Sequence, residues 1–179
     1  METIKQKEKK AYSTLKAKYG YKNVMAAPRL VKVVISSGTG SGIKRNKDFN
    51  NLVIDRISKI TGQKPATKSA KKSVASFKIR MGDPVGVMVT LRGARMYGFL
   101  EKLINVAIPR TKDFRGIERK IVDDIGNLTM SIKEHTIFPE TGDEELKDVF
   151  GFAITLVTTA KTKAEATEFF ELIGVPFKK

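Results

Sequence analysis

Eight positive side chains and one carboxylate lie between residues 64 and 95 of the 179-residue sequence. The cations are Lys64, Lys68, Lys71, Lys72, Lys78, Arg80, Arg92 and Arg95, and the acid is Asp83. This stretch, the basic segment, holds a net +7 of the chain's +15. Like charges held this close repel one another, so a fold that keeps them together is expected to gain an anionic partner. Neutralising phosphates and releasing their counterions would supply the binding free energy. A merely solvated charged face is the simpler alternative.

A glycine-rich loop at residues 37–42 is the second feature that could bind phosphate, because it lies between an expected strand and an expected helix. Its spacing does not match a nucleotide site. A P-loop needs Gly-Lys-Ser/Thr in a row, but Ile43 separates Gly42 from Lys44, and the dinucleotide fingerprint needs glycine at position 43. The loop is better interpreted as a turn, or as a stretch whose amides meet an RNA backbone. A phosphate-loop enzyme is kept as an alternative function.

Other catalytic chemistry has few candidate residues. The sequence has no cysteine and one histidine, His135, so thiolate metal sites and nucleophile–base pairs cannot be assembled. Asp123 and Asp124 could form a carboxylate pair, but adjacent side chains diverge unless a loop bends them together. We therefore expect no enzyme activity, no metal and no cofactor.

Length and composition indicate one globular domain over residues 1–179, with residues 1–20 as an N-terminal helical arm. The first ten residues are dense in Lys and Glu, unlike a signal peptide. The longest charge-free apolar stretch, residues 149–160, is too short for a membrane span. A cytoplasmic protein without a membrane partner is expected.

Hydrophobic periodicity predicts four helices and five strands. The helices cover residues 3–19, 47–60 and 94–108, the last closed by Pro109, and a stretch from a Thr162–Glu165 capping box to Gly174. The strands cover residues 30–36, 74–80, 85–92, 128–134 and 152–158. The expected fold class is α+β: a two-layer domain with a mainly antiparallel sheet, helices on one face and a basic outward face.

The alternation within the strands sets which side chains face outward. Residues 74–80 and 85–92 are expected to form a hairpin with an exposed turn at residues 81–84, with Phe77 on the apolar face. The outward residues are Lys32, Ser36, Lys78, Arg80, Thr90, Arg92 and Lys133. Because this face has no aromatic side chain, it is expected to recognise RNA backbone shape rather than splayed bases. DNA is disfavoured, since no helix presents the basic side chains that a major groove would need.

Acidic residues gather elsewhere. Residues 121–150 contain eight acids against two lysines. A basic chain with one acidic pole suggests a second, basic protein neighbour, although the acids could simply solvate a loop.

Many short runs resemble the 5S rRNA-binding protein-five family of the bacterial large ribosomal subunit. They span nearly the whole chain from Pro28 on, in the family's order and spacing. They are residues 60–65 (ITGQKP), 70–80 (AKKSVASFKIR), 89–93 (VTLRG), 95–97 (RMY), 109–110 (PR), 113–116 (DFRG), 132–134 (IKE), 138–140 (FPE) and 158–161 (TTAK). Two stretches depart from the family pattern: Ser36 stands where the family has an RNA-contacting asparagine, and residues 122–128 lack a usual arginine and aromatic.

The resemblance implies a two-layer α+β ribosomal protein in the central protuberance. Its partners would be 5S rRNA, the elbow of P-site tRNA, small-subunit ribosomal protein thirteen and neighbouring large-subunit proteins of the 5S particle, with no homo-oligomer expected. The rRNA-binding residues would be Lys32, Ser36, Gln63, Lys64, Thr67, Lys68, Lys71, Lys72, Thr90, Arg92 and Arg95. The tRNA-binding residues would be Lys78, Arg80, Met81, Gly82 and Asp83. The bridge to the small subunit would use Arg110, Asp113, Phe114, Arg115, Asp143 and Glu144. A non-ribosomal RNA-binding protein is the other alternative.

Overall fold

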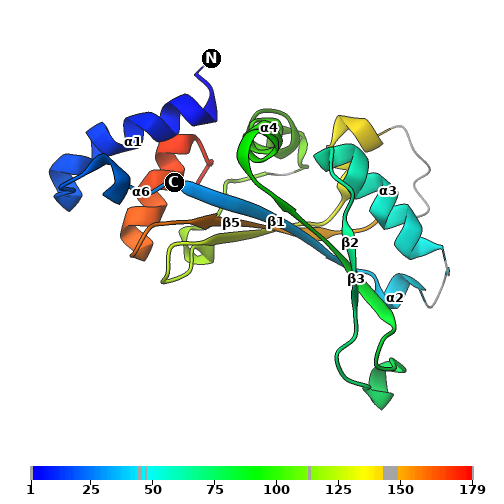
Figure 1. The fold of residues 1–179 in the computed structure, drawn as a ribbon. Coiled ribbons are helices and arrows are strands. Elements are labelled where there is room, and N and C mark those ends of the chain that lie inside the picture. The colour runs from blue at the N-terminus through cyan, green and yellow to red at the C-terminus, as the bar shows by residue number, and fades with distance from the viewer. Residues whose placement is uncertain (1, 44–45, 47, 113, 143–148, 179) are drawn as a thin grey trace. The chain divides into compact units, whose positions relative to one another are not determined.

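A computed structural model of the chain describes residues 2–43, 46, 48–112, 114–142 and 149–178. Within this part of the chain, five strands form one antiparallel sheet in the order β2-β3-β1-β5-β4 (Figure 1). They are β1 (Leu30–Gly38), β2 (Ala66–Ser69), β3 (Pro84–Leu91), β4 (Leu128–Ile132) and β5 (Phe152–Thr158). The α+β fold class expected from the sequence is confirmed.

The chain divides into two compact units. Unit 1 comprises residues 1–33, 92–130 and 155–179, and unit 2 comprises residues 34–91 and 131–154. Strands β1, β4 and β5 each contribute residues to both units. The basic segment therefore belongs mainly to unit 2, with Arg92 and Arg95 in unit 1.

Unit 1 is built on helices α1 (Ile4–Tyr19), α4 (Gly93–Lys102) and α6 (Lys163–Ile173). Helix α1 packs against α6 and α4, as Figure 1 shows. The apolar stripes of these helices supply the core, with Leu15, Phe99 and Phe169 all buried. Short 3₁₀ turns η1 (Val24–Ala26) and η4 (Arg119–Ile121) complete the unit.

The ends of α1 and α6 follow from local capping. Thr3 and Gln6 form a capping box at the start of α1, and Gly20 ends the helix with a φ of 64°. At α6 the Thr162 hydroxyl accepts from the Glu165 N–H, as expected. The Glu165 carboxylate does not complete the box, because it accepts instead from the Lys161 N–H and the Tyr21 hydroxyl. The capping box predicted at α6 is therefore only half formed.

The third helix continues beyond the proline that was expected to close it. Helix α4 passes into a π-helical stretch, η3 (Leu103–Ala107), and then into α5 (Ile108–Arg110). The Ile108 N–H bonds to the Leu103 carbonyl, five residues back. This wider turn allows the chain to accommodate Pro109, which lacks an N–H and would crowd a regular helical turn.

Unit 2 has a core formed by α3 (Phe49–Thr61), β3 and the described residues of 131–142 and 149–154. Helix α3 packs on β3 and ends at Gly62 in the left-handed conformation, where the sequence indicated. The short elements are α2 (Gly40–Ile43), η2 (Ala75–Phe77), η5 (His135–Ile137) and η6 (Pro139–Thr141). Ile57, Val87 and Phe138 are among its fully buried side chains.

The strand expected at residues 74–80 is wrong, and so is the hairpin built on it. Strand β3 pairs instead with β2, with Lys68 opposite Gly86 and Ser69 opposite Pro84. Residues 70–83 form an excursion between these strands that contains η2, and the two strands extend beyond the rest of unit 2 toward it (Figure 1). Alternation alone did not suffice, because the excursion has no core behind it and most of its side chains are exposed.

Candidate nucleic-acid interface

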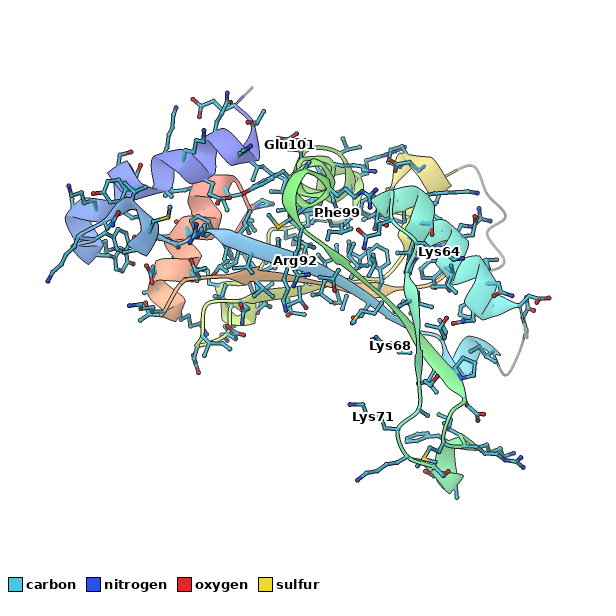
Figure 2. All side chains as sticks on the ribbon, viewed as in Figure 1. Lys64, Lys68, Lys71, Arg92, Phe99 and Glu101 are labelled. Atoms are coloured by element: carbon cyan, nitrogen blue, oxygen red, sulfur yellow. The ribbon has the colours of Figure 1, made fainter. Side chains whose placement is uncertain are left out.

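The cations of the basic segment are exposed before, within and after β2, in the excursion between β2 and β3, and at the start of α4. Lys64 precedes β2, Lys68 lies within it, and Lys71 and Lys72 follow it. Lys68 and Lys71 project from the same side of the β2–β3 arm (Figure 2). A short paired arm thus presents a row of ammonium groups to solvent.

Apart from Arg95, these cations form no ion pair with any carboxylate that the structure describes. They are Lys64, Lys68, Lys71, Lys72, Lys78, Arg80 and Arg92. The one acid of the segment, Asp83, accepts at Oδ2 from the Arg80 backbone N–H at 2.7 Å. The positive charge is therefore not balanced locally, which is the condition for binding a polyanion.

The strand register separates the outward residues from the inward ones. In an antiparallel pair, directly opposed side chains lie on the same face. Thr67 is opposite Val87, so it lies on the same face of the pair as that buried residue, although its own side chain is exposed. Its hydroxyl oxygen accepts from the Asn50 amide at 3.4 Å. Lys68 lies on the opposite face, opposite Gly86. Both predicted contacts are thus exposed, and Thr67 is in addition hydrogen-bonded to α3 through Asn50.

Gln63 and Thr90 are brought together. The Gln63 side-chain amide donates to the Thr90 carbonyl at 3.2 Å, and both side chains are half-buried. This bond joins the end of α3 to the end of β3. It fixes the orientation of Gln63 beside the outward face.

The other predicted rRNA-binding residues are distributed between the units. Ser36, on β1 in unit 2, is exposed. Lys32, on the part of β1 in unit 1, is half-buried, and Arg92 and Arg95 are exposed at the start of α4. Ser36 alternates with the buried Ile35 and Ser37, so the predicted outward direction of its side chain is confirmed.

The predicted tRNA-binding residues lie on the excursion, which hydrogen bonds hold in shape. Val74 and Ile79 exchange backbone bonds of 3.0 and 3.2 Å around η2. The Met81 N–H donates to the Ser73 hydroxyl at 3.0 Å, and the Gly82 N–H donates to the Ala70 carbonyl at 3.0 Å. Lys78 has a φ of 52°, which makes it the one non-glycine residue in the left-handed region among the described residues. We call residues 73–82 the tip.

Phe77 is exposed at the tip, so its predicted place on the apolar face is wrong. The 3₁₀ turn η2 breaks the extended alternation that would have turned it inward. The available signal was the density of Ser, Ala and Lys around Phe77, which leaves too few apolar residues to form a buried strand face. The conclusion that the basic surface has no aromatic side chain is corrected accordingly.

The predicted bridge residues are described only in part. Arg110, at the end of α5, and Phe114 and Arg115 beyond it are exposed. Asp113, Asp143 and Glu144 lie outside the described residues. The three described residues all belong to unit 1.

The glycine-rich loop is packed against the protein. Thr39 is fully buried, and its hydroxyl donates to the Asn50 amide oxygen at 3.1 Å. A Cβ at Gly42 would lie 2.2 Å from the Phe49 ring, so glycine is needed there for close packing. This explains the glycine without a phosphate ligand.

The remaining candidates for chemistry are structural. His135 is buried and stacks on Phe150 at 4.4 Å, and burial followed by the charge of Arg56 lowers its pKa. Among the described residues, no group of three His, Asp or Glu side chains is placed to hold a metal ion. No helix in that same part of the chain is long and apolar enough to cross a membrane.

Comparison with known proteins adds independent findings. Residues 23–80 match the family model of ribosomal protein L5, and residues 84–177 match the model of the same family's C-terminus. The large ribosomal subunit protein uL5 of Thermotoga maritima is 47% identical over 174 residues, covering 97% of this chain and 94% of the relative. The protein of the same name in Desulforamulus reducens is 50% identical over 165 residues, covering 92% and 91%.

Proposed function

Because the chain belongs to the ribosomal protein L5 family, we propose that it binds 5S rRNA in the central protuberance of the large ribosomal subunit. Family membership makes it a structural constituent of that subunit, located on the ribosome in the bacterial cytoplasm. It is not an enzyme, which removes the phosphate-loop alternative.

The observation that carries this proposal is the row of cations on the β2–β3 arm that form no ion pair with a described carboxylate. Lys64, Lys68, Lys71 and Lys72 would neutralise rRNA phosphates, while Ser36 and the oriented Gln63 amide would hydrogen-bond sugar or phosphate. Lys32, Thr90, Arg92 and Arg95 extend the proposed rRNA-binding set. Thr67 would act indirectly, by holding β2 against α3 through Asn50.

The tip would contact the elbow of P-site tRNA. Lys78, Arg80 and Met81 are exposed there, and Gly82 and Asp83 shape the turn through their backbone bonds. The preformed hydrogen bonds of the tip support this role, since an ordered loop loses less entropy on binding.

Protein contacts complete the proposal. Arg110, Phe114 and Arg115 would face small-subunit ribosomal protein thirteen, together with Asp113, Asp143 and Glu144. Neighbouring large-subunit proteins of the 5S particle would cover other parts of the chain. We propose that residues 1–179 act as one domain, with residues 1–20 as its helical arm.

Filter binding to 5S rRNA and tRNA at several salt concentrations tests the proposal. Replacing Lys71, Lys72, Lys78 and Arg92 with Ala should weaken binding. It should also lower the salt slope, the gradient of log affinity against log salt, by about one unit for each phosphate that is no longer neutralised. An unchanged salt slope for both RNAs in the quadruple variant would show that the site is elsewhere.

A competition assay separates this function from that of a general RNA-binding protein. At physiological salt, a 5S rRNA-specific protein should retain its labelled 5S rRNA in the presence of excess unrelated transcript. Equal displacement by 5S rRNA and by the unrelated transcript would favour the non-ribosomal alternative, since backbone charge alone does not discriminate between sequences.

A further inference from the structure

The tip exposes apolar side chains in the middle of the basic segment. The exposed fractions are 63% for Phe77, 73% for Met81 and 39% for Val74. Phe77 is also the only aromatic residue in the sequence between residues 64 and 95. Leaving this much apolar surface in water lowers stability, so a partner that covers it would gain the hydrophobic free energy.

The exposure belongs to an ordered turn. Backbone bonds join Val74 and Ile79 on either side of η2, and the half-buried Ile79 faces the glycine-rich loop, where its Cδ1 lies 3.9 Å from a Cβ built on Gly40. Lys78 holds a left-handed conformation at φ 52°, which is costly for a side chain with a Cβ. The fold therefore fixes the backbone that carries Phe77, and the ring is presented with little further loss of entropy on binding.

Charge identifies the chemistry of the partner. Lys71, Lys72, Lys78 and Arg80 flank the apolar residues in the sequence and are all exposed, and the Asp83 carboxylate accepts from the Arg80 backbone N–H. A complementary surface must combine a flat apolar face with negative charge close by. A nucleobase with its flanking phosphates has both, and aromatic side chains beside cations are the usual means of stacking bases.

We propose that Phe77, supported by Met81, stacks on a single base at the end of a helical stack in a folded RNA. This rests on the proposed function, in which the tip meets the tRNA elbow. One ring can cover one base, whereas binding along a single strand needs several aromatic side chains and a groove. The tip would thus read an exposed end of an RNA stack, while its cations hold the phosphates.

Binding of the full-length protein to tRNA and to 5S rRNA tests the inference with four variants. Phe77→Ala should reduce the affinity for the RNA that meets the tip by roughly 5- to 150-fold, the range for the loss of one stacked base, with an unchanged salt slope. Phe77→Trp should keep the affinity, because it keeps a ring. Lys78→Ala and Arg80→Ala should each lower the slope by about one unit. Thermal unfolding of each variant checks folding, which substitution at an exposed position should not alter.

The outcomes separate the inference from the function on which it rests. If Lys78→Ala and Arg80→Ala weaken RNA binding but Phe77→Ala does not, the tip binds RNA phosphates without stacking and the inference is overturned. In that case the apolar residues would serve an acidic protein surface. If none of the variants changes binding to either RNA, the proposed role of the tip is wrong as well. A base analogue such as 2-aminopurine at the elbow, quenched by wild type and not by Phe77→Ala, would support stacking directly.

Discussion

Helix α1 and the basic segment are both rich in lysine, yet they use it differently. In α1, Lys18 forms an ion pair with Glu168, Lys10 forms one with Glu2, and Lys7 donates to the Ile173 carbonyl at 3.2 Å. In the basic segment, among the described residues, Lys64, Lys68 and Lys72 have no such partner. The lysines of α1 with these partners hold unit 1 together or neutralise local acids, while those of the β2–β3 arm remain available for a ligand.

The difference shows that the number of cations alone does not locate a binding surface. What matters is whether the fold supplies the opposite charge nearby. Exposed ion pairs contribute little to stability, so pairing is best taken as a sign that a lysine is already engaged. By that measure the β2–β3 arm is a stronger candidate than α1 for the RNA-binding surface, even though both regions are exposed to solvent.

Two triple variants with the same loss of charge give the sharpest test of this comparison, and the largest expected effect. Lys64, Lys68 and Lys72 replaced by Ala should lower the salt slope of 5S rRNA binding by about three units, one for each phosphate contact. Lys7, Lys10 and Lys18 replaced by Ala should leave the slope nearly unchanged. Filter binding across a salt series measures both.

Equal slopes in the two triple variants would contradict the comparison. That result would mean that 5S rRNA responds to the total charge of the protein and not to the arm. Circular dichroism of both variants is the control, because a loss of helix in the α1 variant would complicate its slope.

Glu165 tests the other half of the comparison, that polar groups around α1 serve the fold. Its buried carboxylate accepts from the Tyr21 hydroxyl and the Lys161 N–H, and it links the chain beyond α1 to the start of α6. Burial, followed by this hydrogen bond, raises the pKa of Tyr21. Glu165→Ala should cost about 1–3 kcal/mol in the free energy of unfolding, since two donors lose their acceptor. Urea denaturation measures it.

Tyr21→Phe is the matched variant, because it removes one hydroxyl and leaves the bond from Lys161. Its cost should be smaller, about 1 kcal/mol. Both variants should bind 5S rRNA with the wild-type salt slope. A lowered slope with unchanged stability would assign Glu165 to the RNA surface and would remove the distinction between the two regions.

Much of the fold could be predicted because its signals are local. The cap at Thr162, the glycines that end α1 and α3, and the alternation of β5 all depend on residues close in sequence. The errors arose where residues distant in the sequence determine the local structure. Strand β2 is four exposed residues long and exists because β3 pairs with it. The π-helical turn before Pro109 is equally invisible to a helix-period analysis.

The sequence indicated which charged residues belong to the candidate site, but it did not predict the backbone shape that carries them. Ser36 faces outward as alternation indicated, and Lys68, which was expected on a loop, is exposed on β2. Thr67 is exposed but lies on the same face as Val87, since the register of β2 depends on a pairing that the sequence did not reveal. Phe77 was assigned to a core face because its neighbours alternate, but an alternating stretch is buried only where another layer covers it. At the tip no such layer exists among the described residues, and the same ring becomes an exposed group.

Glu8 gives the smallest expected effect. It tests the comparison between α1 and the basic segment through pH. Burial raises the pKa of this α1 carboxylate, although the Tyr97 hydroxyl donates to it at 2.8 Å and opposes the shift. The same burial, with that hydrogen bond, raises the pKa of Tyr97 to about 12. Because the folded protein holds the Glu8 proton more tightly than the unfolded chain, this group favours folding below its ordinary pKa of 4.5. That contribution is lost as pH rises through the raised value.

Glu8→Gln should remove this dependence while keeping an oxygen for Tyr97. The difference in unfolding free energy between wild type and Glu8→Gln should therefore shift in favour of wild type as pH falls from 7 to 4, measured by urea denaturation at each pH. Taking the difference cancels the titration of the other carboxylates. A flat difference would mean that hydrogen bonding offsets burial at Glu8, and a shift the other way would mean that it outweighs burial. Since Glu8 lies on α1, whose polar side chains contact the protein itself, the salt slope of 5S rRNA binding at pH 7 should be the same in both proteins.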